Sequence, residues 1–308
     1  MPATSEREPL AVTQLVTVVT PCLNAERFLD ETIRSVLQQD YPRIEYIVMD
    51  GGSTDGTLDI LRKYEPNLRW ISAPDRGAAD AVNRGFALGK GEILAFLNAD
   101  DRYHPGAVSA AVRHLRENRE AAGVYGDAWW IGEDGAHIAP YPVRDFDREL
   151  LERECFICQP ASFLRRLPFE SIGGLDPGLR LTFDYELWLR LTRTYPLRRI
   201  DATLADSRMH LANKTLGQRR GVFRETFQVL KRNCGYVPFQ WVYAWLCFQA
   251  DARDQFFEPL HPSVMRYLQS LPVGLWTNSG CMGRYLAEWA SVMSWSGLGR
   301  RLYLNRFL

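Results

Sequence analysis

Short apolar runs alternate with helical patterns through the first half of the chain, and this alternation limits the fold more than any other feature. The runs have the length of strands and occupy residues 15–20, 44–49, 68–72 and 92–97. After the first run, Phe28, Ile33 and Val36 recur at roughly helical spacing. Strands that alternate with helices form mostly parallel sheets whose faces are covered by those helices. We therefore predict an α/β fold with a mostly parallel sheet flanked by helices.

Acidic residues follow two of these runs directly. Asp50 comes after the run 44–49, and the run 92–97 ends in Asn98-Ala99-Asp100-Asp101. The carboxyl ends of parallel strands meet at one edge of a sheet, where ligands bind in such folds. Carboxylate oxygens suit a divalent cation that also holds phosphates, and free N–H groups at helix starts favour anions. The acids at this edge predict a site for a nucleotide diphosphate and a metal. The alternative is an ordinary Asp-Asp turn that caps the next helix.

Composition limits the class of protein. The 308 residues carry 37 basic and 37 acidic side chains, and the basic residues form no clusters, which argues against a nucleic-acid partner. No segment offers the roughly 18 consecutive apolar residues of a membrane span. Cys155 and Cys158 form the one close pair among six cysteines, and we interpret them as structural thiols, so we expect a cytoplasmic protein.

The character of the chain changes near residue 218. Residues 1–12 are polar and predict a flexible N-terminus, and residues 13–218 predict the α/β domain. Within it we expect a helix over about 25–39, a loop or hairpin region over 129–153 and a final strand over 204–210. Residues 219–308 predict a helical C-terminal region with eleven Lys or Arg, five Asp or Glu and five of the nine Trp. Helices that pack on the α/β domain or form a homodimer contact are one interpretation. Peripheral contact with the inner face of the plasma membrane is the other, and the apolar segment 236–250 suits a buried or an interfacial helix.

Several strings resemble the family 2 glycosyltransferases, whose nucleotide-sugar-binding fold is the α/β fold of GT-A type. The strings are Val16–Thr20 with Pro21-Cys22-Leu23-Asn24, Ile47–Thr57, Asp75-Arg76-Gly77 with Asp80 and Asn83-Arg84-Gly85, and Leu97-Asn98-Ala99-Asp100-Asp101. No phosphate-binding Gly-x-x-x-x-Gly-Lys-Ser/Thr or Gly-x-Gly-x-x-Gly competes with them. The resemblance covers roughly residues 13 to 215. It implies transfer of a sugar from a nucleotide diphosphate sugar to an acceptor hydroxyl, with inversion at the anomeric carbon.

The resemblance also implies which residues bind the donor. They are Pro21, Asn24, Asp50, Arg76, Asp80, Asn83, Asn98, Asp100 and Asp101. Asp100 matches the metal-binding aspartate of the family's Asp-x-Asp motif, and His210 is the second candidate ligand for Mn²⁺ or Mg²⁺. Asn98 stands where the motif has its first Asp, which leaves fewer charged ligands for a metal. Gly51 stands where the family often has an acid, which puts recognition of the nucleotide base in question.

Asp184 matches the family's general base. It lies in Thr182-Phe183-Asp184-Tyr185-Glu186, where Phe183 replaces a frequent Glu, and a helix-capping role for Asp184 is the alternative. Gln159 and Trp188 are the candidate acceptor-binding residues. We expect Glu186 to face solvent or to hold a basic neighbour.

The function predicted from the sequence is therefore a metal-dependent inverting glycosyltransferase of the hexosyltransferase type. Its donor would be a UDP or dTDP sugar, and its acceptor a glycan or a lipid-linked saccharide of a cell envelope polysaccharide. Two alternatives are a non-catalytic protein of the same fold that binds sugar nucleotides or glycans, and a nucleotidyltransferase on a similar sheet.

Overall fold

A computed structural model describes residues 14–251 and 263–292 of the chain. The predicted flexible N-terminus, residues 1–12, lies outside the described residues. Within these two ranges, no helix combines the length and the apolar character needed to cross a bilayer.

The first half of the chain forms alternating strands and helices, as predicted. The elements are β1 (Val16–Cys22), α1 (Leu29–Leu37), β2 (Ile44–Asp50), α2 (Thr57–Lys63), β3 (Arg69–Ser72), α3 (Ala78–Leu88) and β4 (Ile93–Phe96). The strands pair in parallel in the order β3-β2-β1-β4. Because β2 and β4 flank β1 on opposite sides, the chain reverses its direction of travel across the sheet at β1.

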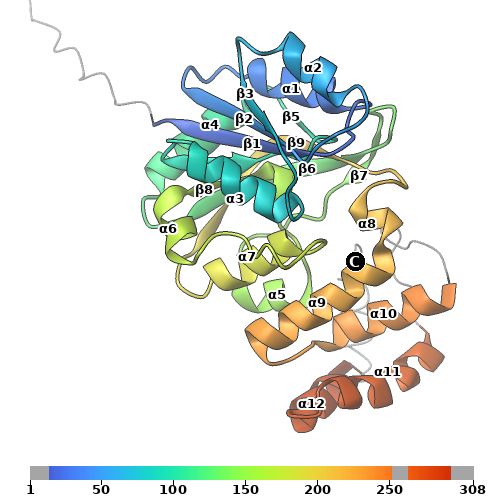
Figure 1. Cartoon of the computed structure of the whole chain (residues 1–308). Helices are drawn as coiled ribbons and strands as arrows, with labels where there is room; N and C mark the ends of the chain where they lie inside the picture. Colours follow the sequence, from blue (N-terminus) through green and yellow to red (C-terminus); the bar gives the residue numbers. More distant parts are fainter. Residues whose placement is uncertain (1–13, 252–262, 293–308) are drawn as a thin grey trace, which may run out of the picture.

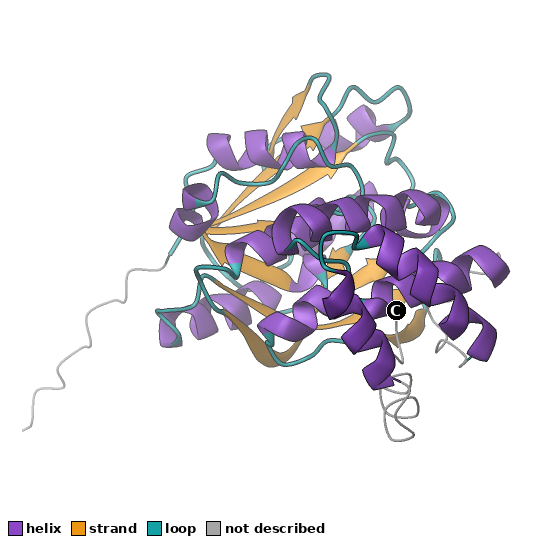
Figure 2. Cartoon of the chain, turned by 90° about the horizontal axis from the view of Figure 1, so that it is seen from below, coloured by secondary structure: helices purple, strands orange, loops and turns teal. Residues whose placement is uncertain are grey.

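The second half continues the same sheet in a mixed arrangement. Its elements are β5 (Arg102–Tyr103), α4 (Ala107–Glu117), β6 (Gly123–Ile131), β7 (His137–Pro140), α5 (Arg148–Arg153), a 3-10 turn (Gln159–Ala161), β8 (Ser162–Arg165), α6 (Arg166–Ser171), α7 (Phe183–Leu191), β9 (Leu197–Arg208) and α8 (Lys214–Gly217). The order runs β4-β8-β6-β9-β5, and β7 pairs with β6. β8 is antiparallel to both of its neighbours, whereas β6 and β9 are parallel. The predicted α/β sheet flanked by helices is confirmed, and Figure 2 shows helices on both of its sides.

Three local predictions differ from the structure. Residues 129–153, expected as a loop or hairpin region, contain the end of β6, the strand β7 and the helix α5. β9 begins at Leu197, not at Leu204. α1 begins at Leu29 instead of Ala25, because the N–H groups of Ala25 and Glu26 bond to Thr57 and Asp55 in the neighbouring loop.

Four further helices complete the described chain and confirm a helical C-terminal appendage. They are α9 (Arg219–Cys234), α10 (Phe239–Asp251), α11 (Val264–Thr277) and α12 (Met282–Val292), and they stack below the sheet in Figure 1. The parts of the predicted region 219–308 at 252–262 and 293–308 lie outside the described residues. Val242 and Tyr243 of α10 are buried, so the structure supports the buried rather than the interfacial alternative for this segment. Phe223 and Trp241 join one hydrophobic core with Tyr185 of α7.

The outer helices α11 and α12 carry exposed apolar side chains. These are Val264, Met265, Leu268, Trp276, Met282 and Leu286. Membrane contact and a homodimer both stay predictions for this surface, since neither is tested by the packing of the single chain.

Candidate active site

The candidate site lies at the carboxyl edge of the parallel strands. The strand order reverses at β1, and in α/β sheets a crevice for ligands opens at such a reversal, beyond the strand ends. β1 ends at Cys22, β2 at Asp50 and β4 at Phe96, so the residues that follow all meet at this edge. The sequence predicted the same edge from its polar strand ends.

Asp50 organises the loop that follows β2. Its buried carboxylate accepts hydrogen bonds from the N–H groups of Gly52 and Ser53 and from the hydroxyls of Ser53 and Ser72. These bonds hold the pKa of Asp50 below its usual range, despite the opposing effect of burial. Asp50 therefore stabilises the loop as an ionised carboxylate, and a direct contact with a nucleoside stays a prediction.

The same loop is tied to the end of β1 by Asn24. Its side chain accepts from the N–H of Thr54 at 2.9 Å, and its own N–H donates to Ser53 Oγ at 2.7 Å. Asn24 adopts a left-handed backbone conformation with φ of +50°. Pro21 is buried within β1 opposite Met49, so both residues shape the edge from the β1 side. The hydroxyl of Ser53 bonds to Asp50, and the cap position of α2 is Gly56.

The turn after β4 separates its two acids into different surroundings. Asp101 is buried, and its carboxylate accepts from the N–H of Arg208 at 2.9 Å and from Asn98 Nδ2 at 3.1 Å. Burial and the adjacent Asp100 raise the pKa of Asp101 well above its usual range. Asn98 Nδ2 also donates to Gln159 Oε1 at 3.1 Å, so the amide bridges two acceptors beneath the turn. Because other protein groups already bind Asp101 and the Asn98 Nδ2 group, neither is directed at a ligand.

Asp100 faces the other way and meets His210 at the end of β9. Asp100 Oδ2 lies 3.1 Å from His210 Nε2, and the Asp100 side chain is 27% exposed. Arg208 Nε donates to the carbonyl of Asp100 at 2.8 Å and fixes the turn against β9. A carboxylate oxygen and an imidazole nitrogen at this spacing fit two ligands of a divalent cation, with further ligands left for phosphate oxygens and water.

Asp184 lies in the first turn of α7 and is partly exposed. Partial burial, which removes water from the carboxyl group, is the main cause that raises the pKa of Asp184 to about 6. The negative charge of Glu225 adds to the rise, and backbone hydrogen bonds and Lys214 oppose it. A carboxyl group with a pKa near 6 is a better proton acceptor than an ordinary aspartate and is still ionised at neutral pH.

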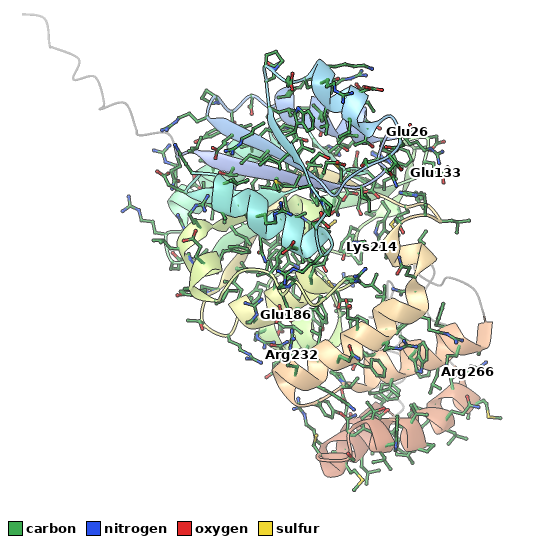
Figure 3. The ribbon with its side chains drawn as sticks, viewed as in Figure 1. Glu26, Glu133, Glu186, Lys214, Arg232 and Arg266 are labelled. Atoms are coloured by element: carbon green, nitrogen blue, oxygen red, sulfur yellow. The ribbon has the colours of Figure 1, made fainter. Side chains whose placement is uncertain are left out.

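Lys214 connects the two parts of the site. It opens α8, and Figure 3 shows it between the sheet and α9. Its ammonium interacts electrostatically with Asp100 and Asp75 on the donor side, and with Asp184 and Glu225 on the other. Partial burial of this group lowers the pKa of Lys214.

The remaining predicted donor residues lie on α3 or just before it. Arg76 is exposed and pairs with Asp80 at 2.7 Å, and this pair raises the pKa of Arg76 and lowers that of Asp80. The side-chain amide of Asn83 donates to the carbonyl of Leu175 at 2.8 Å and accepts from the N–H of Leu175 at 3.0 Å. Asn83 therefore fastens the turn at Gly174 to α3, and its predicted donor contact finds no support here.

The two predicted acceptor residues are not placed at an open surface. Trp188 is fully buried in the core. Gln159 is buried beneath β4, where it donates to the carbonyl of Phe96 at 2.6 Å and accepts from Asn98. The structure does not support a direct acceptor contact for either residue, because core packing or internal hydrogen bonds occupy both. Glu186 is also buried and pairs with Arg190, so its expected solvent-facing alternative is wrong.

A second group of metal-binding residue types lies where β5, β7 and β9 meet. Asp206 Oδ1 is 2.7 Å from His104 Nε2 and 3.7 Å from His137 Nε2. The ligand atoms of the three residues all lie within 4.8 Å of one another, so the group has the types and spacing of a metal site. Arg102 Nε binds the other oxygen of Asp206 at 2.6 Å and already balances its charge. Strand-end acids in the sequence give no sign of this group, because its three members are 33 or more residues apart along the chain.

Comparison with known proteins agrees with the geometry. Residues 17–173 match the sequence profile described as Glycosyl transferase family 2. An uncharacterized glycosyltransferase of Mycobacterium tuberculosis is 35% identical over 181 residues, which cover 57% of this chain and 68% of the relative. A PGL/p-HBAD biosynthesis glycosyltransferase of Mycobacterium bovis is 33% identical over 181 residues, covering 57% and 69%. An uncharacterized glycosyltransferase of Rickettsia felis is 29% identical, covering 67% of this chain, and the match spans 36% of the length of that relative.

Solved structures share the fold. A Staphylococcus aureus TarS fragment in complex with UDP has a TM-score of 0.61 at 15% identity, covering 95% of this chain and 88% of that one. The mannosyltransferase PcManGT from Pyrobaculum calidifontis, in complex with GDP-Man and Mn²⁺, has a TM-score of 0.53 at 17% identity, covering 96% and 83%. The predicted GT-A type fold is thereby confirmed. The chain belongs to glycosyl transferase family 2.

Proposed function

We propose that this protein transfers a hexose, with inversion, from a UDP- or dTDP-linked donor to a hydroxyl of a glycan or lipid-linked acceptor in cell envelope polysaccharide synthesis. The observation that carries the proposal is the approach of Asp100 Oδ2 to His210 Nε2, 3.1 Å apart where the turn after β4 meets the end of β9. The UDP-GlcNAc and UDP complexes of TarS and the GDP-Man complex of PcManGT support a nucleotide sugar as the donor. The envelope acceptor is supported by the relative named for PGL/p-HBAD biosynthesis.

In the proposed reaction, Asp184 accepts the proton of the acceptor hydroxyl as its oxygen forms a bond to the anomeric carbon. The bond from that carbon to the diphosphate oxygen breaks on the opposite face, which inverts the configuration and releases a nucleoside diphosphate. Lys214 offsets the negative charge that builds on the departing diphosphate. Asp100 and His210 are the residues that would hold a divalent cation, which when bound supplies further charge stabilisation to these oxygens.

The family profile ends at residue 173, before α7 begins, so the proposed role of Asp184 rests on its raised pKa and its place in the site. The proposed role of Asp100 rests on the imidazole beside it. The two roles therefore need separate tests.

The metal site is tested by thermal unfolding with UDP, dTDP or GDP, each with and without Mn²⁺. We expect one of the first two nucleotides to raise the melting temperature only when Mn²⁺ is present. Asp100→Asn should abolish this Mn²⁺-dependent rise, because an amide oxygen is a much weaker ligand than a carboxylate. Asp59→Asn, which removes an exposed carboxylate on α2, is the matched control and should leave the rise unchanged. A rise that persists in Asp100→Asn would exclude Asp100 as a ligand.

The reaction itself is tested by donor turnover. Wild-type protein should release nucleoside diphosphate from its donor, and Asp184→Asn should lose this activity while it still binds the nucleotide. Wild-type protein that binds the nucleotide but turns over none of a panel of donors and acceptors would favour a non-catalytic binding protein. Release of pyrophosphate in place of nucleoside diphosphate would indicate a nucleotidyltransferase.

A further inference from the structure

One carboxylate from the C-terminal region holds the segment that leads into α7. Glu225, on α9, accepts hydrogen bonds from the N–H groups of Arg180 at 2.9 Å, Leu181 at 2.7 Å and Thr182 at 2.6 Å. The hydroxyl of Thr182 donates to the same carboxylate at 3.0 Å. Four donors on three consecutive residues thus converge on a single side chain that lies more than 40 residues further along the chain.

These bonds act at the start of the helix that carries Asp184. Thr182 is the cap residue of α7, and its own side chain caps no N–H group of the helix. N–H groups at a helix start lack partners within the helix and interact favourably with a negative charge. Glu225 supplies that charge from outside, so the position of the first turn of α7 depends on α9.

A second contact between α9 and the same segment lies two turns further along α9. Arg232 pairs with Asp176 at 2.6 Å and with Glu186 at 3.1 Å. Figure 3 shows Glu186 and Arg232 side by side. Glu186 is buried and also binds Arg190 at 2.7 Å within α7. α9 therefore binds residues on both sides of Asp184.

Glu225 also affects the base electrostatically. Its negative charge is one of the causes that raise the pKa of Asp184, and Lys214 lies close enough to interact with both carboxylates. Removal of the charge at residue 225 therefore changes both the anchoring of the loop and the protonation of Asp184.

We propose that Glu225 is a positioning residue for sugar transfer, whose carboxylate holds the first turn of α7 so that Asp184 faces the acceptor hydroxyl. This inference rests on the proposed role of Asp184 as the base. It makes the C-terminal region, through α9, a part of the active site.

The test compares Glu225→Gln with wild type and with Glu120→Gln, a matched control at an exposed glutamate. Gln keeps the size of Glu but can accept fewer of the four bonds and carries no charge. We expect kcat to fall by roughly tenfold to a hundredfold, as for a small misplacement of a catalytic group, while the donor KM stays unchanged. The acid limb of the kcat profile should move to lower pH, because loss of a neighbouring negative charge lowers the pKa of Asp184.

Amide hydrogen exchange gives a second measurement that needs no substrate. Glu225→Gln should accelerate exchange at residues 180–186, with the rest of the sheet unchanged. If both the exchange rates and the kcat of Glu225→Gln match those of wild type, the proposal is overturned. It is also overturned if kcat falls only because the variant unfolds globally, with no shift in its pH profile. The proposed function fails separately: if Asp184→Asn keeps full activity, Asp184 is not the base, and faster exchange in Glu225→Gln would then show an anchoring role alone.

Discussion

Asp184→Asn should stabilise the protein while it abolishes transfer. The pKa of Asp184 is raised from 3.8 to about 6, and roughly two pKa units correspond to about 3 kcal/mol at 1.36 kcal/mol per unit. The folded protein holds the proton of Asp184 more tightly than the unfolded chain does. The ionised carboxylate therefore costs stability, and this cost begins near pH 4, grows up to about pH 6 and is constant above it.

Asn carries no charge, so the variant avoids this cost. We expect the free energy of unfolding of Asp184→Asn to exceed that of wild type by about 1 to 3 kcal/mol at pH 8, the lower end allowing for the partial exposure of the side chain. At pH 4.5 the difference should fall to about 1 kcal/mol or less, because the cost is then only beginning. For a chain of this size the gain at pH 8 amounts to about 2 to 6 °C in melting temperature.

The assay is urea unfolding of wild type and variant at both pH values. Asp201→Asn, at a side chain that is 97% exposed, serves as the control and should show no comparable gain. In the same way, kcat of wild type should fall below about pH 6, as Asp184 becomes protonated and can no longer accept a proton. A variant that is less stable than wild type at pH 8, or a gain that does not depend on pH, would refute this account of the base.

Two further substitutions test the packing around the site. Asn98→Asp restores the acid that the family has at this position, yet it removes the amide that bridges Asp101 and Gln159 and places a second carboxylate beside a buried one. We expect the free energy of unfolding in urea to fall by roughly 2 to 4 kcal/mol. An unchanged stability together with tighter Mn²⁺ binding would contradict this expectation. Gly85→Ala places a Cβ 2.6 Å from Val19 Cγ1, where α3 crosses β1, and should cost about 1 to 3 kcal/mol. Val19→Ala should recover part of that loss in the double variant, and no recovery would mean that the clash is not the cause.

The parallel half of the sheet and its functional edge could be predicted because their physical causes are local. Residues of β1, β2 and β4 are buried on both faces of the sheet and read as continuous apolar runs. Strand ends are marked in the sequence by the first polar residues, as at Asp50 and Asn98. β9 was only partly predicted, since Arg198 and Asp201 occupy exposed positions of the strand and interrupt its apolar pattern.

The division of roles within the site could not be predicted from the sequence. Asp100 and Asp101 are adjacent and chemically identical, and only the fold shows that Asp101 is buried against Arg208 while Asp100 meets His210. The role of Glu225 is hidden for a different reason, because its partners are distant in the sequence and are backbone groups that every residue type possesses. A resemblance carried over residue by residue also cannot detect that a position such as Trp188 is enclosed by the core.

The core that joins α7 to the C-terminal helices bears on how the chain unfolds. Tyr185 packs on Trp241, and Phe223 of α9 packs on the same indole, so loss of the C-terminal helices would uncover apolar surface of the helix that bears the base. We therefore expect that the change in composition near residue 218 does not mark a border between two independent folding units. The described residues, 14–251 and 263–292, should lose their structure in one cooperative transition, with donor binding and the C-terminal helices disappearing together as denaturant rises.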